Sequence, residues 1–180
     1  MTYTIIPCNA EAHGDAVLEI FNDAIANTTA SYDERLHTEE SIRRWFDAKQ
    51  GAGCPVIAAI DTTSGELLGF AAYGPFRTQS GYRLTVEHSV YVHQRQRGKG
   101  LGRALLQRLL ELARAQGLHL MVGVIDMANQ PSIALHAQLG FSHAGTLRQA
   151  GAKFGRWLDV GFFQYLLDQD EAPRPAPANP

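Results

Sequence analysis

The sequence is poor in cysteine, and this limits the kinds of site that it can build. Cys8 and Cys54 are the only cysteines among 180 residues, and neither belongs to a CxxC pair or has a histidine at ligand spacing. A disulfide framework or a zinc site is therefore not indicated, and a reducing cytoplasm fits. His88 and His93 lie five apart on a predicted strand and its exit, so they should not share a metal. We expect no bound metal.

Charge of one sign and long apolar runs are also scarce. The formal net charge is -2 and the isoelectric point is near 6.4. Such a surface has no long-range field that would gather nucleic acid or an anionic membrane, so a small molecule is the expected partner. The first seven residues lack the basic and apolar regions of a signal peptide, and no apolar run approaches a membrane span. We therefore expect a cytoplasmic protein.

Length and composition predict one domain. A chain of this length with 45% hydrophobic residues can bury one substantial core. Residues 171–180 hold four of the eight prolines and almost nothing apolar, so burial cannot offset the entropy lost on ordering them. We predict a single domain over residues 1–170 and a disordered proline-rich tail over 171–180.

Hydrophobic spacing predicts a mixed order of helices and strands. Apolar residues recur at helical spacing after residue 10, after a capping Thr38, and in the leucine-rich stretch that ends at Gly117. The predicted helices span 10–27, from 39 onward, 100–116 and 132–139. Runs rich in β-branched residues predict strands at 55–60, 67–73, 87–92, 119–126, 143–148 and 158–167. The fold class is therefore α/β.

A basic, glycine-rich turn between a strand and the longest helix is the most informative segment. Gly98, Gly100 and Gly102 let several backbone N–H groups point at one place, where the helix N-terminus adds positive potential. A pyrophosphate is the expected occupant. The P-loop motif is absent, because the single Gly-Lys pair is followed by Gly100, and the dinucleotide fingerprint is broken at Arg103. A nicotinamide-dependent oxidoreductase, for which Asp126 could bind ribose, stays a weak alternative.

Two ordered motifs carry a resemblance to a known family. The stretch 95–100, Arg-Gln-Arg-Gly-Lys-Gly, resembles the Arg/Gln-x-x-Gly-x-Gly/Ala signature of the GNAT acetyltransferase superfamily. Residues 129–141 resemble the Asn-x-x-Ala/Ser-x-x-Leu-Tyr-x-x-x-Gly-Phe stretch of the same superfamily. The resemblance implies a GNAT fold, which is a central mixed, mostly antiparallel sheet of six to seven strands flanked by about four helices. It also implies acetyl-CoA as co-substrate.

Two further stretches resemble one branch of that superfamily. Residues 85–92, Thr-Val-Glu-His-Ser-Val-Tyr-Val, and 153–159, Lys-Phe-Gly-Arg-Trp-Leu-Asp, are similar to the phosphinothricin and methionine sulfoximine acetyltransferases. This branch implies acetylation of the α-amine of a small amino-acid-like substrate, such as L-methionine sulfoximine, methionine sulfone or phosphinothricin, in detoxification. It also implies a homodimer.

Position on the predicted strand and the resemblance together suggest roles for individual residues. Glu87, near the start of the strand that ends at Val92, could face the amine and is the candidate base for its proton, whereas pairing with Arg83 would make it structural. His136 stands where many members carry the tyrosine that protonates the departing thiolate, so it is the candidate acid, and a capping or core histidine is the alternative. The cofactor is expected at Val90, Tyr91, Val92, Arg97, Gly98, Lys99, Gly100, Leu101, Gly102, Arg103, Asn129 and Ser132. Through their backbone groups, Val90 and Val92 would pair with the pantetheine arm and polarise the acetyl carbonyl.

The acceptor is expected over the loop that precedes the strand at 87–92. Arg77 or Arg83 could grip a carboxylate or an oxidised sulfur or phosphorus group through bidentate hydrogen bonds. The predicted substrate-binding residues are Tyr32, Arg77, Ser80, Gly81, Tyr82, Arg83, Lys153 and Phe154. Core packing explains Tyr32 and Phe154 equally well at this stage.

Two alternatives keep the fold and change the function. A non-catalytic CoA-sensing module would use the same cofactor loop, since cofactor binding does not establish turnover. An enzyme acting on a protein amine would need an open groove, which the near-neutral charge and the long segment between the first two helices disfavour.

Overall fold

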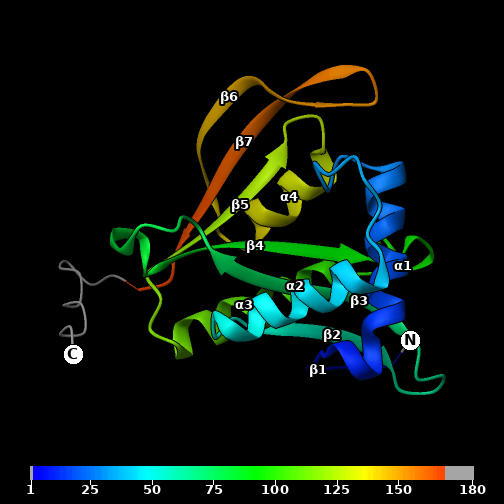
Figure 1. Ribbon diagram of the computed structural model, residues 1–180. Coiled ribbons are helices and arrows are strands. Elements are labelled where there is room, and N and C mark those ends of the chain that lie inside the picture. Colours follow the sequence, from blue (N-terminus) through cyan, green and yellow to red (C-terminus); the bar gives the residue numbers. More distant parts are fainter. Residues whose placement is uncertain (1, 169–180) are drawn as a thin grey trace.

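The computed structural model describes residues 2–168, and the predicted tail at 171–180 lies outside this part. This described part of the chain contains four α-helices and seven strands (Figure 1). The helices are α1 (Ala10–Asn27), α2 (Glu39–Gly51), α3 (Leu101–Ala115) and α4 (Gln130–Gln138). The strands are β1 (Tyr3–Pro7), β2 (Val56–Asp61), β3 (Leu67–Pro75), β4 (Thr85–Val92), β5 (Leu120–Asp126), β6 (Ser142–Lys153) and β7 (Arg156–Leu166). Short 3-10 turns lie at Ser80–Tyr82 and Gln94–Gln96.

The strands form one mixed sheet in the order β1-β2-β3-β4-β5-β7-β6. Every neighbouring pair is antiparallel except β4 and β5, which run parallel. Helices cover both faces of the sheet, and the β6–β7 hairpin extends past α4 (Figure 1). The predicted fold class, a mostly antiparallel sheet of six to seven strands with about four helices, is confirmed.

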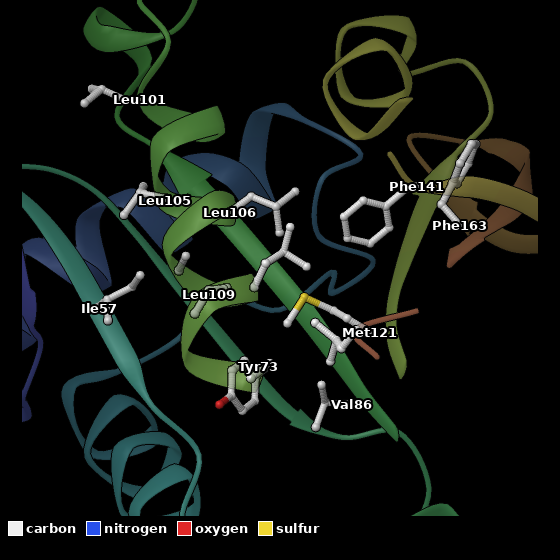
Figure 2. Packing of buried hydrophobic residues seen from close by; sticks show 14 of the residues in the cluster. Ile57, Tyr73, Val86, Leu101, Leu105, Leu106, Leu109, Met121, Phe141 and Phe163 are labelled. Carbon is white, nitrogen blue, oxygen red and sulfur yellow. The ribbon is translucent and has the colours of Figure 1, made fainter. Parts of the chain in front are cut away.

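Each face of the sheet has its own hydrophobic cluster. On one face the leucines of α3 pack against Met121, Phe141 and Phe163 (Figure 2). On the other face Phe21 of α1 lies among aromatic rings that include Phe70 and Tyr91, with centroid distances of 5.2 and 4.6 Å. Since both faces are covered, β3 is buried along almost its whole length.

The start of α1, the start of α2 and the end of α3 lie within one residue of the predicted positions, whereas α4 begins two residues earlier than predicted. The Asn9 side chain accepts a hydrogen bond from the amide of Ala12 at 2.8 Å and begins α1. Thr38 and Ser41 form a capping box at the start of α2. Gly117, which follows the C-cap residue Gln116 of α3, has a φ of 70°, the left-handed conformation that glycine tolerates.

The parallel pair β4–β5 is short. The pairing joins residues 85–87 of β4 to residues 120–122 of β5 and ends at Glu87 and Val122. Beyond this point β4 continues to Val92 against β3, whereas β5 continues to Asp126 against β7. The two strands therefore separate after Glu87 and leave one edge of each without a neighbouring strand.

Two strands differ clearly from the prediction, whereas the bounds of the other five differ by at most two residues. β1 was not predicted as a strand, because its five residues show no clear alternation, and β2 supplies its hydrogen-bonding partner. The strand predicted at 143–148 continues to Lys153, with register shifts between His143 and Gly145 and between Leu147 and Gly151. Glycines in a strand weaken the sequence pattern, while the pairing with β7 maintains the strand.

Within residues 2–168, no helix combines the length and apolarity that a membrane crossing requires.

Candidate active site

A cavity of about 1340 Å³ opens where β4 and β5 separate. The second half of β4, the end of β5, the loop before α3 and the first turns of α4 line it, together with the segment between α1 and α2. Most predicted cofactor and catalytic residues line this one space: Glu87, Val90, Tyr91, Val92, Arg97, Gly98, Gly100, Leu101, Gly102, Arg103, Asn129, Ser132 and His136. Lys99 is in the same loop but is not part of the lining.

The glycine loop has the backbone that phosphate binding requires. Gly98 and Gly100 have φ values of 76° and 83°, and the space where a Cβ would lie is open at both. The first amides of α3 have no partner within the helix, and Gly100 at the N-cap has no side chain to satisfy them. A Cβ on Gly102 would come within 3.2 Å of Leu135, so glycine also allows α3 to approach α4. The loop therefore fits the pyrophosphate of a coenzyme.

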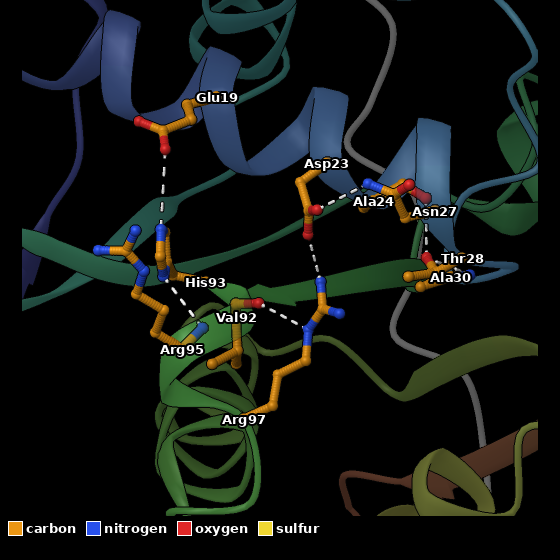
Figure 3. A network of polar contacts seen from close by, with 10 residues as sticks. All are labelled: Glu19, Asp23, Ala24, Asn27, Thr28, Ala30, Val92, His93, Arg95 and Arg97. Carbon is orange, nitrogen blue, oxygen red and sulfur yellow. Dashed lines mark hydrogen bonds and ion pairs between the residues drawn. The ribbon is translucent and has the colours of Figure 1, made fainter.

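Arg97 ties this loop to α1. Its Nη2 lies 2.6 Å from Asp23 Oδ2, and its Nε donates to the carbonyl of Val92 at 3.2 Å (Figure 3). Close by, His93 lies 3.7 Å from Glu19 of the same helix (Figure 3). Asp23 is mostly buried, so its pairing with Arg97 is screened less than a surface ion pair.

Alternate residues of β4 face opposite sides of the sheet. Val90 and Val92 pack with the α3 cluster, whereas Tyr91 is buried against α1. Glu87 therefore faces the α1–α2 side, while His88 faces α3 and α4. The opening between β4 and β5 consequently joins two faces with different side chains.

Glu87 is half-buried at the point where the strands separate. Burial raises the pKa of its carboxyl group, and the positive charges of Arg77 and Lys49 act in the opposite direction. Lys49 of α2 donates from Nζ to the carbonyl of Tyr73 at 3.0 Å, and burial lowers the pKa of this amine. A carboxylate of raised basicity therefore lines the cavity with two cations near it.

His136 is buried on α4 and contacts a second histidine. Its Nδ1 lies 2.7 Å from the carbonyl oxygen of Ser132, and its Nε2 lies 3.1 Å from Nε2 of His88. The structure thus brings His136 to the cavity, but its outer nitrogen contacts His88. Burial lowers the pKa of both rings.

Asn129 and Ser132 begin α4. The side chain of Asn129 accepts a hydrogen bond from the amide of Ser132 at 3.2 Å, so this oxygen is used as the N-cap of the helix. Asn129 also lines the cavity, as do Ser132 and Gly100.

Tyr32 and Phe154 also line the cavity, as does Asp126 at the end of β5. Within the described residues, the buried Tyr32 hydroxyl has no hydrogen-bond partner. Its burial and the nearby negative charge of Asp126 raise the pKa of Tyr32 to about 12. Phe154 has a φ of 52°, an unusual conformation for a bulky residue, which costs about 1–3 kcal/mol. The Asp126 carboxylate lies 3.5 Å from Arg156. The cavity lining thus includes a hydroxyl without a partner among the described residues, an aromatic ring and an ion pair.

Other predicted substrate residues lie outside the lining. Lys153 is buried, and its Nζ donates to the carbonyl of Ser31 at 2.6 Å, so it anchors the segment between α1 and α2. Arg77 stacks on Phe76, with 4.2 Å from its Cζ to the ring centroid. Its positive charge also counteracts the rise that burial causes in the pKa of Glu87. The remaining members belong to the loop between β3 and β4, around the 3-10 turn: Ser80, Gly81, Tyr82 and Arg83.

Sequence reasoning missed four residues that the fold adds. His88 was considered only as a metal ligand, although strand alternation already places this polar residue among the apolar ones of β4. No local sequence pattern marks Lys49, Asp23 or Arg156. Each of them forms its hydrogen bond or ion pair with a residue far away in the chain. Within residues 2–168, no group of three potential ligands could hold a metal ion.

Comparisons with known proteins agree with this geometry. The sequence model of the acetyltransferase (GNAT) family matches residues 17–141. The chain is 53% identical to an L-methionine sulfoximine/L-methionine sulfone acetyltransferase of Pseudomonas paraeruginosa over 152 residues, 84% of this chain and 88% of the relative.

Solved structures agree as well. The fold matches yncA of Salmonella typhimurium, determined with its cofactor acetyl-CoA, with a TM-score of 0.92 and 41% identity over 98% of this chain and 100% of that one. It matches a phosphinothricin acetyltransferase of Sinorhizobium meliloti in complex with acetyl-CoA, with a TM-score of 0.91 and 36% identity over 98% and 94% of the two chains. The family match covers more than half of the chain, so this protein belongs to the GNAT family of N-acetyltransferases.

Proposed function

We propose that the chain transfers the acetyl group of acetyl-CoA to the α-amine of a small amino-acid-like substrate. The observation that carries this proposal is the position of Glu87, which lines the cavity where β4 and β5 separate, together with the glycine loop. A candidate base and a candidate phosphate site thus share one space. The substrate class follows the relatives, which are named for methionine sulfoximine, methionine sulfone and phosphinothricin.

The cofactor would occupy the loop and the free edge of β4. Backbone amides of Gly98, Gly100 and the start of α3 would hold its pyrophosphate, with Lys99 and Arg103 adding positive charge. Backbone groups of Val90 and Val92 lie on the part of β4 that has no β5 partner, so they can pair with the amides of the pantetheine arm. Acetyl-CoA supplies an activated acyl carbon and a thiolate leaving group.

Glu87 would take the proton of the amine. As the amine nitrogen bonds to the acyl carbon, the C–S bond breaks, and the carboxylate accepts the proton that the nitrogen loses. Its burial favours this role, because a carboxyl group with a raised pKa is a stronger base than an exposed one.

Residues of the cavity lining and of the loop before β4 would together recognise the acceptor. Tyr32 keeps its hydroxyl protonated at neutral pH and can donate to an oxygen on sulfur or phosphorus. Arg77 and Arg83, on the loop before β4, would bind the carboxylate of the substrate. Phe154 would cover the apolar part of the side chain. We place this reaction in the cytoplasm, where it would detoxify such compounds, and the free thiols of Cys8 and Cys54 support a reducing compartment.

Replacement of the proposed base tests the chemistry and the substrate class together. Thiol release from acetyl-CoA would be followed with methionine sulfoximine, methionine sulfone, phosphinothricin and methionine as acceptors. We expect fast release with at least one oxidised or phosphinate acceptor and a loss of kcat/KM of about 100-fold or more in Glu87→Gln, the range of a positioned base. Glu66→Gln, a change at an exposed carboxylate next to β3, should leave the rate unchanged.

The same assay separates the alternatives. If acetyl-CoA binds but no amine causes release of the CoA thiol, a CoA-sensing module is favoured. If only a peptide amine causes thiol release, a protein acceptor is favoured. Binding of NADH in place of acetyl-CoA would revive the oxidoreductase. Wild-type turnover by Glu87→Gln would contradict the role of the base.

The pH dependence of the reaction tests the environment of Glu87. Lys49→Met removes a positive charge that holds the carboxyl pKa down, so the pKa rises further and Glu87 becomes protonated at a higher pH. Because the base must be deprotonated, we expect the acidic limb of the kcat/KM profile to move to higher pH.

Two control variants accompany that profile. Lys49→Arg keeps the charge and should keep the limb in place, as should Arg44→Met, which removes an exposed charge from the same helix. Thermal unfolding of each variant reports on its folding. Superimposable profiles for wild type and Lys49→Met would mean that the titrating base is not Glu87.

The β6–β7 hairpin supports the proposal of a homodimer. Leu147, Phe154 and Trp157 are more than half exposed on this hairpin, which extends past α4 (Figure 1). Exposed apolar residues gathered on one element are typical of an interface. Light scattering should give twice the chain mass of 19.7 kDa, and Trp157→Glu should shift the protein toward the monomer. A wild-type mass of 19.7 kDa would refute the dimer.

A further inference from the structure

Two histidine rings are stacked in the interior between β4 and α4. The ring centroids of His88 and His136 lie 5.0 Å apart at an interplanar angle of 20°. Both rings meet Phe141 edge-on, and both line the cavity. A Cβ on Gly123 of β5 would come within 2.8 Å of His88 Nε2 and 3.1 Å of His136 Nε2, so only glycine leaves room for the pair.

The hydrogen bonds of the pair fix the positions of its protons. The carbonyl oxygen of Ser132 can only accept, so the Nδ1 of His136, 2.7 Å away, carries a hydrogen. The two Nε2 atoms are 3.1 Å apart and need one proton between them. In a neutral His136 the Nε2 has a lone pair, and the proton therefore belongs to His88, whose Nε2–H donates.

The charged form of the pair lacks the partner that it would need. If His136 were cationic, its Nε2–H would donate to His88, and the proton of a neutral His88 would move to Nδ1. Within residues 2–168, that Nδ1 is buried and has no hydrogen-bond partner, so the proton would have no acceptor there.

The groups around the rings do not offset this cost. From β5 the pair meets Gly123, from α4 the Ser132 carbonyl, and from beyond α4 the rings of Phe141 and Phe163. The carboxylates of Glu87 and Asp126 are on alternate positions of β4 and β5 and face the other side of the sheet. Burial accordingly lowers the pKa of His136, and it lowers the pKa of His88 to about 3.

We propose that His88 is a positioning residue for His136, which it holds in the Nδ1–H tautomer with its Nε2 as a hydrogen-bond acceptor. The proposal rests on the proposed function only where His136 is taken to act in acetyl transfer. The neutral pair has no N–H on His136 Nε2 to give to a thiolate. His136 therefore begins the reaction cycle as an acceptor, and the acid role predicted from sequence would require it to gain a proton first.

Nitrogen NMR of the histidine rings in the whole protein tests the tautomer directly. At neutral pH we expect His136 to carry its hydrogen on Nδ1, and its Nε2 to show the shift of an unprotonated nitrogen that accepts a hydrogen bond. In His88→Phe an aromatic ring remains at this position but the N–H donor is lost. The chemical shift of His136 Nε2 should therefore move to the value of a nitrogen whose lone pair accepts no hydrogen bond. His88→Gln offers an amide N–H at similar reach and should restore the hydrogen-bonded value.

Kinetics of the same variants separate positioning from packing. We expect kcat to fall by about 10- to 100-fold in His88→Phe, with the KM for acetyl-CoA little changed, because misplacement of a reacting group lowers the rate of the chemical step. His88→Gln should recover most of this loss. His93→Gln, a control just beyond the end of β4 and outside the cavity lining, should behave as wild type.

Two results would overturn the proposal. One is a His136 ring that is protonated at Nε2 or cationic at neutral pH in the wild type. The other is a wild-type kcat in His88→Phe, whatever its thermal stability. The NMR result does not depend on the acceptor, so the absence of turnover with every amine tested would contradict the proposed function and leave the tautomer assignment standing.

Discussion

The separation of β4 from β5 is the constraint on which the rest of the site depends. The two strands pair over three residues each and then continue with different partners, β4 with β3 and β5 with β7. Each strand thus keeps one hydrogen-bonded edge, and the other edge is left to the cavity. Backbone groups on such an edge need partners, and the amides of a pantetheine arm can supply them. Residues from both faces of the sheet line this opening.

Burial gives the two faces different chemistry. On the α1–α2 face, Glu87 is a carboxylate made more basic by desolvation and moderated by Lys49 and Arg77. On the α3–α4 face, burial lowers the pKa of His88 and of His136, whose Nε2 atoms lie 3.1 Å apart next to Gly123. An acceptor amine and a coenzyme thiol can therefore meet through the opening, each in a separate environment. The glycine loop and the pairing of Arg97 with Asp23 fix the end where the phosphates would lie.

Local sequence signals were sufficient for most elements and for the cofactor loop. The leucine period of α3, the cap at Thr38 and the glycines of the loop each act over a few residues, so the sequence alone located them, whereas the cap at Asn9 was not identified. β1 and the full length of β6 depend on pairing with distant strands, and their own patterns are weak. For the same reason Lys49 beside Glu87 and His88 beside His136 were missed. Lys153 was predicted to contact substrate, whereas its buried amine bonds Ser31, 122 positions away in the chain.

A crystal structure of the chain with acetyl-CoA would test the central claim most directly. The account predicts the pyrophosphate on the amides of Gly98, Gly100 and the start of α3, and the pantetheine arm along the free edge of β4. It also predicts the thioester beside the opening, between Glu87 on one face and His136 on the other. A coenzyme bound elsewhere, or strands β4 and β5 closed together beyond Glu87 with acetyl-CoA present, would contradict it.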